Sequence, residues 1–167
     1  MHLSYARVAT VILAATIVSG CAALSTVQPG MQRTEVVERM GQPYRVLPLG
    51  NGARLLYSRQ PAGQQVYQVD LDAGDRVVQI RQMLATPEFQ RIVVGTWTRE
   101  DVEREFGPPA SIEHAANWPT DILTYRWYDG QDMFYWVYVD AHNVVRRAEP
   151  GVEYHFDDWT NLSDLGL

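Results

Sequence analysis

Residues 99–109 read REDVEREFGPP and residues 33–43 read RTEVVERMGQP, so one pattern occurs twice, 66 residues apart. In each copy two apolar residues stand four positions apart, Val102 with Phe106 and Val36 with Met40. This spacing places both side chains on one face of a helix. A Gly and then Pro follow, and they favour a helix end at that point. The pattern therefore predicts one short helix in each copy.

The residues before each pattern predict where the helices begin. Thr98 is a good N-cap residue, and Asp101 three positions later is close to a capping box. In the first copy Gln32 takes that place, which predicts a weaker start. Thr86 followed by Pro87 predicts a further short helix ahead of the second copy. The first copy has only residues 22–29 for that helix, so there we expect it to be short or missing.

The repeat continues into segments that alternate between apolar and polar residues. Residues 55–57 (LLY) match residues 123–125 (LTY), and residues 67–72 (YQVDLD) match residues 135–140 (YWVYVD), now 68 positions apart. Alternation with a period of two indicates β-strands. The predicted strands cover residues 54–58, 65–71, 76–80, 122–128, 133–139 and 144–148.

These elements predict the fold class and the division of the chain. The class is α+β, with two tandem ααβββ units whose helices pack on an antiparallel sheet. Asp70 and Asp72 alternate on the strand face opposite the apolar set, so we expect them to be solvated. The predicted segments are a signal peptide at 1–20, a first unit at 21–85, a second unit at 86–150 and an acidic C-terminal tail at 151–167.

The N-terminus carries an export pattern. Arg7 precedes a nearly continuous apolar run over residues 8–18, which is typical of a secretory signal peptide. Cys21 is the only cysteine, and it directly follows Ser19 and Gly20, as in a bacterial lipoprotein signal. In that interpretation Cys21 carries the lipid. The alternative is an ordinary signal peptide or a membrane anchor, although a membrane span needs about 20 apolar residues.

Two stretches resemble a known family. Residues 94–102 (VGTWTREDV) with 106–109 (FGPP), and residues 30–36 (GMQRTEV) with 40–43 (MGQP), resemble the helix motif of the SmpA/OmlA lipoproteins, also called BamE-like. The lipoprotein signal is similar as well. Two such units in tandem also resemble the architecture of the β-lactamase inhibitory protein.

The resemblance implies a function. It implies a non-catalytic lipoprotein, acylated (palmitate) at Cys21, anchored in the outer membrane and facing the periplasm. It also implies envelope proteins as partners, namely the machinery that assembles outer membrane β-barrel proteins. Ala22, rather than Asp, after the cysteine favours the outer membrane. The family's best-known member has one unit and this chain has two, so a tethered protein inhibitor or an independent envelope binding module stays open.

Other chemistry has little support in the sequence. The histidines (His2, His114, His142 and His155) show no metal-ligand spacing, and no glycine-rich phosphate loop appears. The net charge of −6 argues against a nucleic-acid partner. We therefore expect no enzymatic activity, no metal and no cofactor. An envelope enzyme remains the rival, because catalytic groups can assemble from distant positions.

The strand at residues 133–139 (MFYWVYV) is apolar on both faces. The repeat aligns Tyr135 with a helix-facing position, which leaves three other aromatic residues on the opposite face. Exposed aromatic residues next to arginine are typical of a protein-binding hot spot. The predicted partner-binding residues are Phe134, Trp136, Tyr138, Arg126 and Tyr128.

The alternative is that these rings are covered by the chain itself. Antiparallel sheets often keep one face in water, so a large aromatic set there needs cover. The other repeat could supply it, and so could the C-terminal segment around Tyr154, Phe156 and Trp159.

Overall fold

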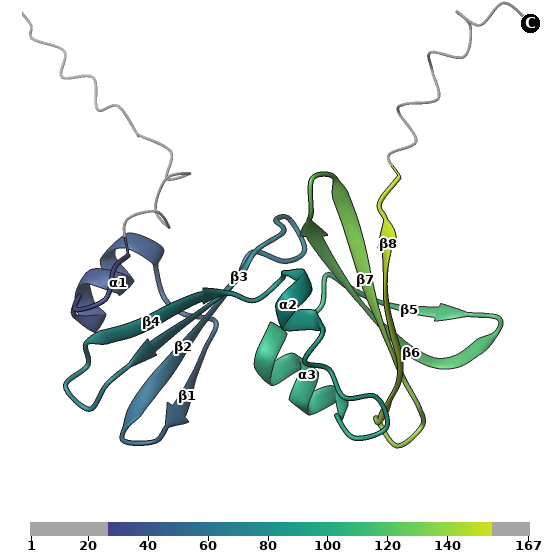
Figure 1. Cartoon of the computed structure of the whole chain (residues 1–167), viewed down its shortest axis with the longest axis horizontal. Coiled ribbons are helices and arrows are strands. Elements are labelled where there is room, and N and C mark those ends of the chain that lie inside the picture. The colour runs from purple at the N-terminus through teal and green to yellow at the C-terminus, as the bar shows by residue number, and fades with distance from the viewer. Residues whose placement is uncertain (1–26, 155–167) are drawn as a thin grey trace, which may run out of the picture.

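The computed structural model describes residues 27–154, and within this range it contains three helices and eight strands (Figure 1). The first half comprises α1 (Arg33–Met40), β1 (Arg45–Leu49), β2 (Gly52–Ser58), β3 (Val66–Leu71) and β4 (Val77–Gln82). The second half comprises α2 (Thr86–Phe89), α3 (Arg99–Phe106), β5 (Ser111–Ala115), β6 (Trp118–Tyr128), β7 (Asp132–Val139) and β8 (Val145–Val152).

The strands form two antiparallel sheets of four strands each. Their orders are β1-β2-β3-β4 in the first sheet and β5-β6-β7-β8 in the second. The predicted fold class of two ααβββ units with helices packed on a sheet is therefore wrong. Over residues 27–154 the protein is mostly two four-stranded sheets with few and short helices.

The two strands that the sequence missed are β1 and β5, and both lie at a sheet edge. Their side chains are mostly exposed, and β1 contains Pro48, so neither shows the alternation of a half-buried strand. Backbone hydrogen bonds hold them instead. The N–H of Tyr44 donates to the Leu56 carbonyl at 2.7 Å, and that of Ala110 donates to the Thr124 carbonyl at 2.8 Å.

The helix predictions from the repeated pattern are confirmed. Both α1 and α3 end where the sequence indicates, at Gly41 and Gly107, whose φ angles are +80° and +74°. At the start of α3 the Thr98 hydroxyl accepts from the Asp101 N–H at 3.3 Å, and the Asp101 carboxylate accepts from the Thr98 N–H at 2.8 Å. Together these two bonds satisfy two of the helix's four free N–H groups.

Equivalent turns join the last two strands of each sheet. Asp72 accepts from the backbone N–H groups two and four positions ahead at 2.8 and 2.9 Å, and Asp140 does so at 2.8 and 3.0 Å. Asp75 and Asn143 take the left-handed conformation at φ of +57° and +60°. The same hydrogen-bonded turn therefore forms twice, 68 residues apart.

Each sheet has its own apolar core on one face. In the first half Val36 of α1 is fully buried with Leu55 and Val69 of the sheet. In the second half Phe89 of α2 stacks on Tyr135 at 3.9 Å between ring centroids. The members of the second core from α3, β6 and β7 are Val102, Phe106, Leu123, Tyr125, Trp127, Val137 and Val139.

The second core also takes in residues of the first half. Val66 of β3, and Met83 and Leu84 after β4, are buried in it. The helices α2 and α3 therefore lie between the two sheets, as Figure 1 shows. One face of the first sheet packs on α1, and its other face meets α3.

The signal peptide at 1–20, Cys21, Phe156 and Trp159 lie outside the described residues. Within residues 27–154 no helix has the length and apolar content that a membrane crossing needs. Gly151 and Val152, at the start of the predicted acidic tail, belong to β8.

Candidate functional site

The second sheet has a core face and an opposite face, which we call the outer face. Leu123, Tyr125 and Val137 point into the core. Because side chains alternate along a strand, their neighbours point the other way. The outer face carries Trp118, Ile122, Thr124, Arg126, Tyr128, Phe134, Trp136, Tyr138, Arg147 and Glu149.

The aromatic residues of the outer face contact one another. The rings of Phe134 and Trp136 lie 5.7 Å apart, and those of Tyr138 and Trp118 lie 5.3 Å apart in an edge-to-face arrangement. The Trp136 ring also covers Gly151 of β8, where an added Cβ would lie 2.2 Å from the ring. All four rings are half-buried, so an apolar patch stays open to solvent.

Charged groups hold the Tyr138 end of the patch. The Arg147 guanidinium lies 4.9 Å from the Tyr138 ring centroid, a cation–π contact. The Tyr138 hydroxyl donates to Glu149 at 3.2 Å, and Arg147 donates to the same carboxylate at 2.6 Å. Burial and then this bond raise the pKa of Tyr138 above its usual value, so the hydroxyl keeps its proton at neutral pH.

The rings exclude water from the middle of the patch. Thr124 lies opposite Trp136 in the sheet and is fully buried. Its hydroxyl has no hydrogen-bond partner among the described residues. A polar group left in this state costs about 1–3 kcal/mol.

Arg126 joins the two halves of the molecule. Its guanidinium pairs with Glu153 at 2.8 Å and donates to the Pro61 carbonyl at 3.1 Å. The side chain of Gln60 also donates to the Arg126 carbonyl at 2.6 Å. The structure thus places this guanidinium in an internal contact, while Tyr128 at the end of the same strand is 61% exposed.

The first half contacts the outer face near Arg126, through the segment that contains Gln60 and Pro61. Tyr154, just beyond β8, is 75% exposed. The rings of Phe134 and Trp136 stay partly exposed to solvent. Of the predicted contact residues, Phe134, Trp136 and Tyr138 form one patch, and Arg126 and Tyr128 lie toward its edge.

The equivalent face of the first sheet is buried and polar. Asp70 is only 5% exposed and binds Arg54 through two bonds of 2.6 and 2.9 Å. Gln68 is 1% exposed and donates to the Glu105 carbonyl of α3 at 2.9 Å. Asp70 was expected to be solvated, and that expectation is wrong because α3 covers this face.

Further hydrogen bonds and ion pairs surround this junction. Arg81 donates to the Gln68 side chain at 2.9 Å, and the carboxylate of Glu105 lies 3.8 Å from Arg54 and 3.2 Å from Arg91. Removing one partner of a buried pair of this kind is strongly destabilising, because the other charge is left uncompensated.

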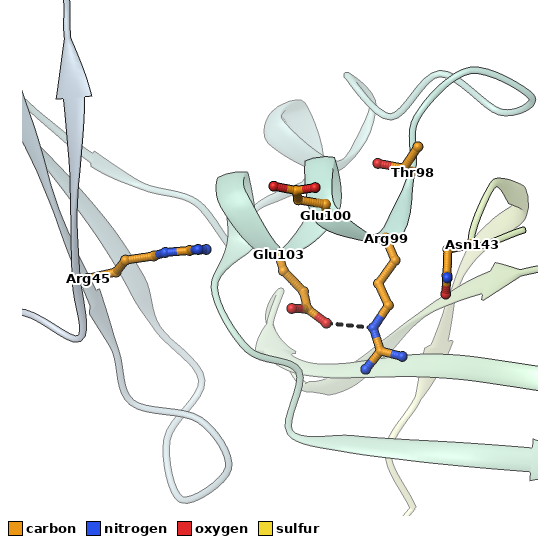
Figure 2. A pocket seen from close by; sticks show the side chains of 6 residues that line it. All are labelled: Arg45, Thr98, Arg99, Glu100, Glu103 and Asn143. Carbon is orange, nitrogen blue, oxygen red and sulfur yellow. Dashed lines mark hydrogen bonds and ion pairs between the residues drawn. The ribbon is translucent and has the colours of Figure 1, made fainter.

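A cavity of about 390 Å³ lies between β1 and α3 (Figure 2). Arg45 points across it from the first sheet toward Glu100 and Glu103. Arg99 lies on its opposite side, bound to Glu103 at 2.7 Å and to Asp121 at 2.7 Å. The lining is a solvated set of charges without a buried nucleophile or base.

The described histidines do not assemble a catalytic or metal site. His114 is exposed and lies 3.0 Å from Asp121, and His142 lies in the exposed turn before β8. Over residues 27–154 no cluster of three His, Cys, Asp or Glu residues is placed to hold a metal ion.

Sequence reasoning missed three members of the outer face, which are Trp118, Arg147 and Glu149. Trp118 lies on an extension of β6 that begins four residues before the predicted strand. The other two follow from the register of β8, which pairs Tyr138 with Arg147 and Trp136 with Glu149. Their signal is the repeat itself, since they align with Gln79 and Arg81 of the first copy.

No protein-family model matches this sequence, and no curated protein matches it. One similar solved structure is a DUF4309 family protein, YjgB, from Bacillus subtilis, 17% identical, with a TM-score of 0.30 over 73% of this chain and 78% of that chain. Another is an extracellular protein containing an SCP domain from Bacillus anthracis, 12% identical, with a TM-score of 0.31 over 93% and 59%. At such TM-scores neither likeness carries an argument about function.

Proposed function

We propose that the protein is a non-catalytic binding module, tethered by lipid at Cys21 to the outer membrane and facing the periplasm. Its role is to hold envelope proteins during assembly, with the machinery that inserts outer membrane β-barrel proteins as the first candidate. The outer face of the second sheet is the contact surface, with Phe134, Trp136 and Tyr138 at its centre.

One observation supports this contact surface above the others. The two sheets have equivalent faces, and the face of the first sheet is buried under α3. The outer face of the second sheet has no such cover within residues 27–154, yet it carries more aromatic surface than the covered face. Half-exposed aromatic rings are typical of the centre of a protein interface.

The test is photo-crosslinking in intact cells that produce the full chain. A photoreactive residue replaces Tyr128, which is exposed beside the patch, and crosslinked products are identified by mass spectrometry. We expect crosslinks to envelope proteins that disappear in Trp136→Ala. The matched control is Ile112→Ala, an exposed apolar residue on the edge strand of the same sheet, and it should keep them.

Three results would separate the alternatives. Crosslinks to subunits of the β-barrel assembly machinery support the proposed role. A crosslink to one periplasmic enzyme, together with loss of that enzyme's activity, would favour the inhibitor. Crosslinks that survive Trp136→Ala in a folded protein would remove the outer face as the contact surface.

A further inference from the structure

We infer that the outer face of the second sheet binds the C-terminal end of α1 from a second copy of this chain, so that copies associate head to tail. This inference rests on the proposed function, because it names the partner of the same contact surface. The two halves of one chain already fit together through a contact of this kind.

The internal junction shows what this kind of sheet face accepts. There the C-terminal end of α3 lies on the first sheet, and Gln68 binds the carbonyl of Glu105. Gly107 just after the helix is buried, with Ser58 and Val66 about 3.7 Å from where its Cβ would be. A sheet face and a helix end of neighbouring halves therefore form a close, hydrogen-bonded contact.

One surface of each type is left uncovered at the two ends of the described chain. The outer face is the equivalent of the covered sheet face, 68 residues later. The end of α1 is the equivalent of the end of α3, 66 residues earlier, and there Gly41 is exposed and Tyr44 is 61% exposed. Placing one on the other repeats the internal junction between two copies.

The residues on these two surfaces differ from those at the equivalent positions of the junction, and the differences on the helix and on the sheet complement each other. At the junction Glu105 faces Gln68 and Arg54. The position equivalent to Glu105 in α1 is Arg39, which is exposed. The positions equivalent to Gln68, Asp70 and Arg81 on the second sheet are Trp136, Tyr138 and Glu149.

The helix end thus changes from acidic in α3 to basic in α1, and the sheet face changes with it. An acid on α3 meets basic and amide groups of the first sheet. An arginine on α1 would meet two aromatic rings and an acid of the second sheet. Aromatic faces attract a guanidinium and a carboxylate pairs with it, so the two uncovered surfaces suit each other.

The contact joins two different surfaces, so each copy can bind one neighbour at each end. Tethered copies share one membrane, which raises their effective concentration and lets a weak contact act. The result is a row of binding modules along the membrane surface. A row of this kind would gather envelope proteins without any catalytic step.

The test uses the full chain in mild detergent and sedimentation velocity over a range of protein concentrations. The wild-type chain should grow beyond a dimer as its concentration rises. Arg39→Glu alters only the helix end and Trp136→Ala only the sheet face, so each should weaken self-association about tenfold or more. An equimolar mixture of the two variants should recover a dimer and nothing larger, because one intact surface of each type remains.

The controls guard against unfolding and general charge effects. Arg45→Glu makes the same charge change at an exposed arginine of β1 and should self-associate as wild type does. If Trp136→Ala loses its fold by circular dichroism, Glu149→Arg replaces it as the variant of the sheet face. Combining Glu149→Arg with Arg39→Glu in one chain should then restore growth, because the charges are exchanged.

Several results would overturn the inference. They are a wild-type chain that stays monomeric at every concentration, self-association unaffected by Arg39→Glu, or a mixture of the two variants that stays monomeric. If Trp136→Ala still removes crosslinks to other envelope proteins in cells, the proposed function stands while this inference fails. If Trp136→Ala changes neither crosslinking nor self-association, both fail.

Discussion

The two sheets share strand order, turns and helix ends, yet their equivalent faces have opposite compositions. The face of the first sheet holds Gln68, Asp70 and Arg81, and α3 covers it. The outer face of the second sheet holds Trp136, Tyr138 and Glu149 at the same positions, and it stays partly open within the described range. Nearly equal backbones thus support a permanent polar junction in one place and an aromatic patch in the other.

This difference shows that sheet geometry alone does not decide what a face contacts. The polar side chains of the first face are tolerable because each has a partner: Arg54 of the same sheet binds Asp70, and Glu105 of α3 binds Gln68. The aromatic rings of the second face stabilise one another with no such partner. The comparison can be tested by changing equivalent residues in the two halves.

The largest effect is expected at the covered face. Asp70→Ala leaves the largely buried Arg54 with Glu105, at 3.8 Å, as its remaining charged partner. We expect it to lower the free energy of unfolding by about 3 kcal/mol, since breaking a buried ion pair leaves an uncompensated charge. The equivalent change Tyr138→Ala removes a half-exposed ring and should cost only about 1 kcal/mol.

Urea unfolding of both variants, followed by tryptophan fluorescence and by far-UV circular dichroism, measures these values. Equal losses of unfolding free energy in the two variants would mean that the contacts of the first face stabilise the fold no more than those of the second. The comparison between a permanent junction and an open patch would then be wrong.

The next effect tests where the two halves are alike. Gly41 and Gly107 both combine a φ near +75° to +80° with an extended ψ, a conformation that favours glycine strongly. Changing either to Ala should lower the free energy of unfolding by about 2 kcal/mol. An added Cβ meets nothing within 4 Å at Gly41 and only ordinary contacts at Gly107, so the two costs should agree within about 0.5 kcal/mol.

Urea denaturation curves of the two glycine variants provide the comparison. A much larger cost at Gly107 than at Gly41 would show that the junction, rather than the backbone conformation, sets the requirement for glycine there.

A smaller effect separates the two helix starts. Thr98→Ala removes the hydroxyl that accepts from the Asp101 N–H and should cost about 1 kcal/mol. At the start of α1 the Glu35 carboxylate accepts from the Gln32 backbone N–H at 2.8 Å, a bond that Gln32→Ala keeps. Gln32→Ala should therefore cost only a few tenths of a kcal/mol. Thermal unfolding of both variants and wild type, followed by circular dichroism, measures these costs. A larger loss in Gln32→Ala than in Thr98→Ala would contradict the prediction.

The smallest effect is expected on the stability of the fold at low pH. Backbone bonds, the first from Val144, and then Arg146 lower the pKa of Asp140 to about 2. Because this pKa is lower in the folded chain than the ordinary 3.8, the carboxylate stabilises the fold above about pH 4. That contribution disappears as the pH falls from about 4 through 2.

Asp140→Asn should consequently lose less stability than wild type between pH 5 and about pH 2.5, as measured by the midpoint of urea unfolding. Equal losses for the two proteins would show that this exposed turn contributes nothing to the acid response.

Part of the fold could be predicted from the sequence because the signals were local. The ends of α1 and α3, the N-cap at Thr98 and the central strands follow from glycine, capping and alternation. The edge strands could not be predicted, since exposed strands such as β1 are held by backbone bonds to a neighbour and need no pattern. Missing them made the predicted fold class wrong.

For the candidate site the same limit applies. Alternation placed Phe134, Trp136 and Tyr138 on one face, and the sheet brings them together. The sequence alone did not reveal that Arg126 is bound to Glu153 and Pro61. Pro61 lies 65 positions and Glu153 27 positions from Arg126 in the sequence, so these contacts depend on how the chain packs in three dimensions.

The sequence by itself determined the repeated helix ends, turns and central strands, because each depends on neighbours within a few positions. Only the tertiary structure decided that Asp70 is buried and that Trp136 stays partly open, although both sit on the same kind of face. The physical reason is that burial depends on what packs against a face. For the first sheet that neighbour is the next half of the chain, which local patterns do not record.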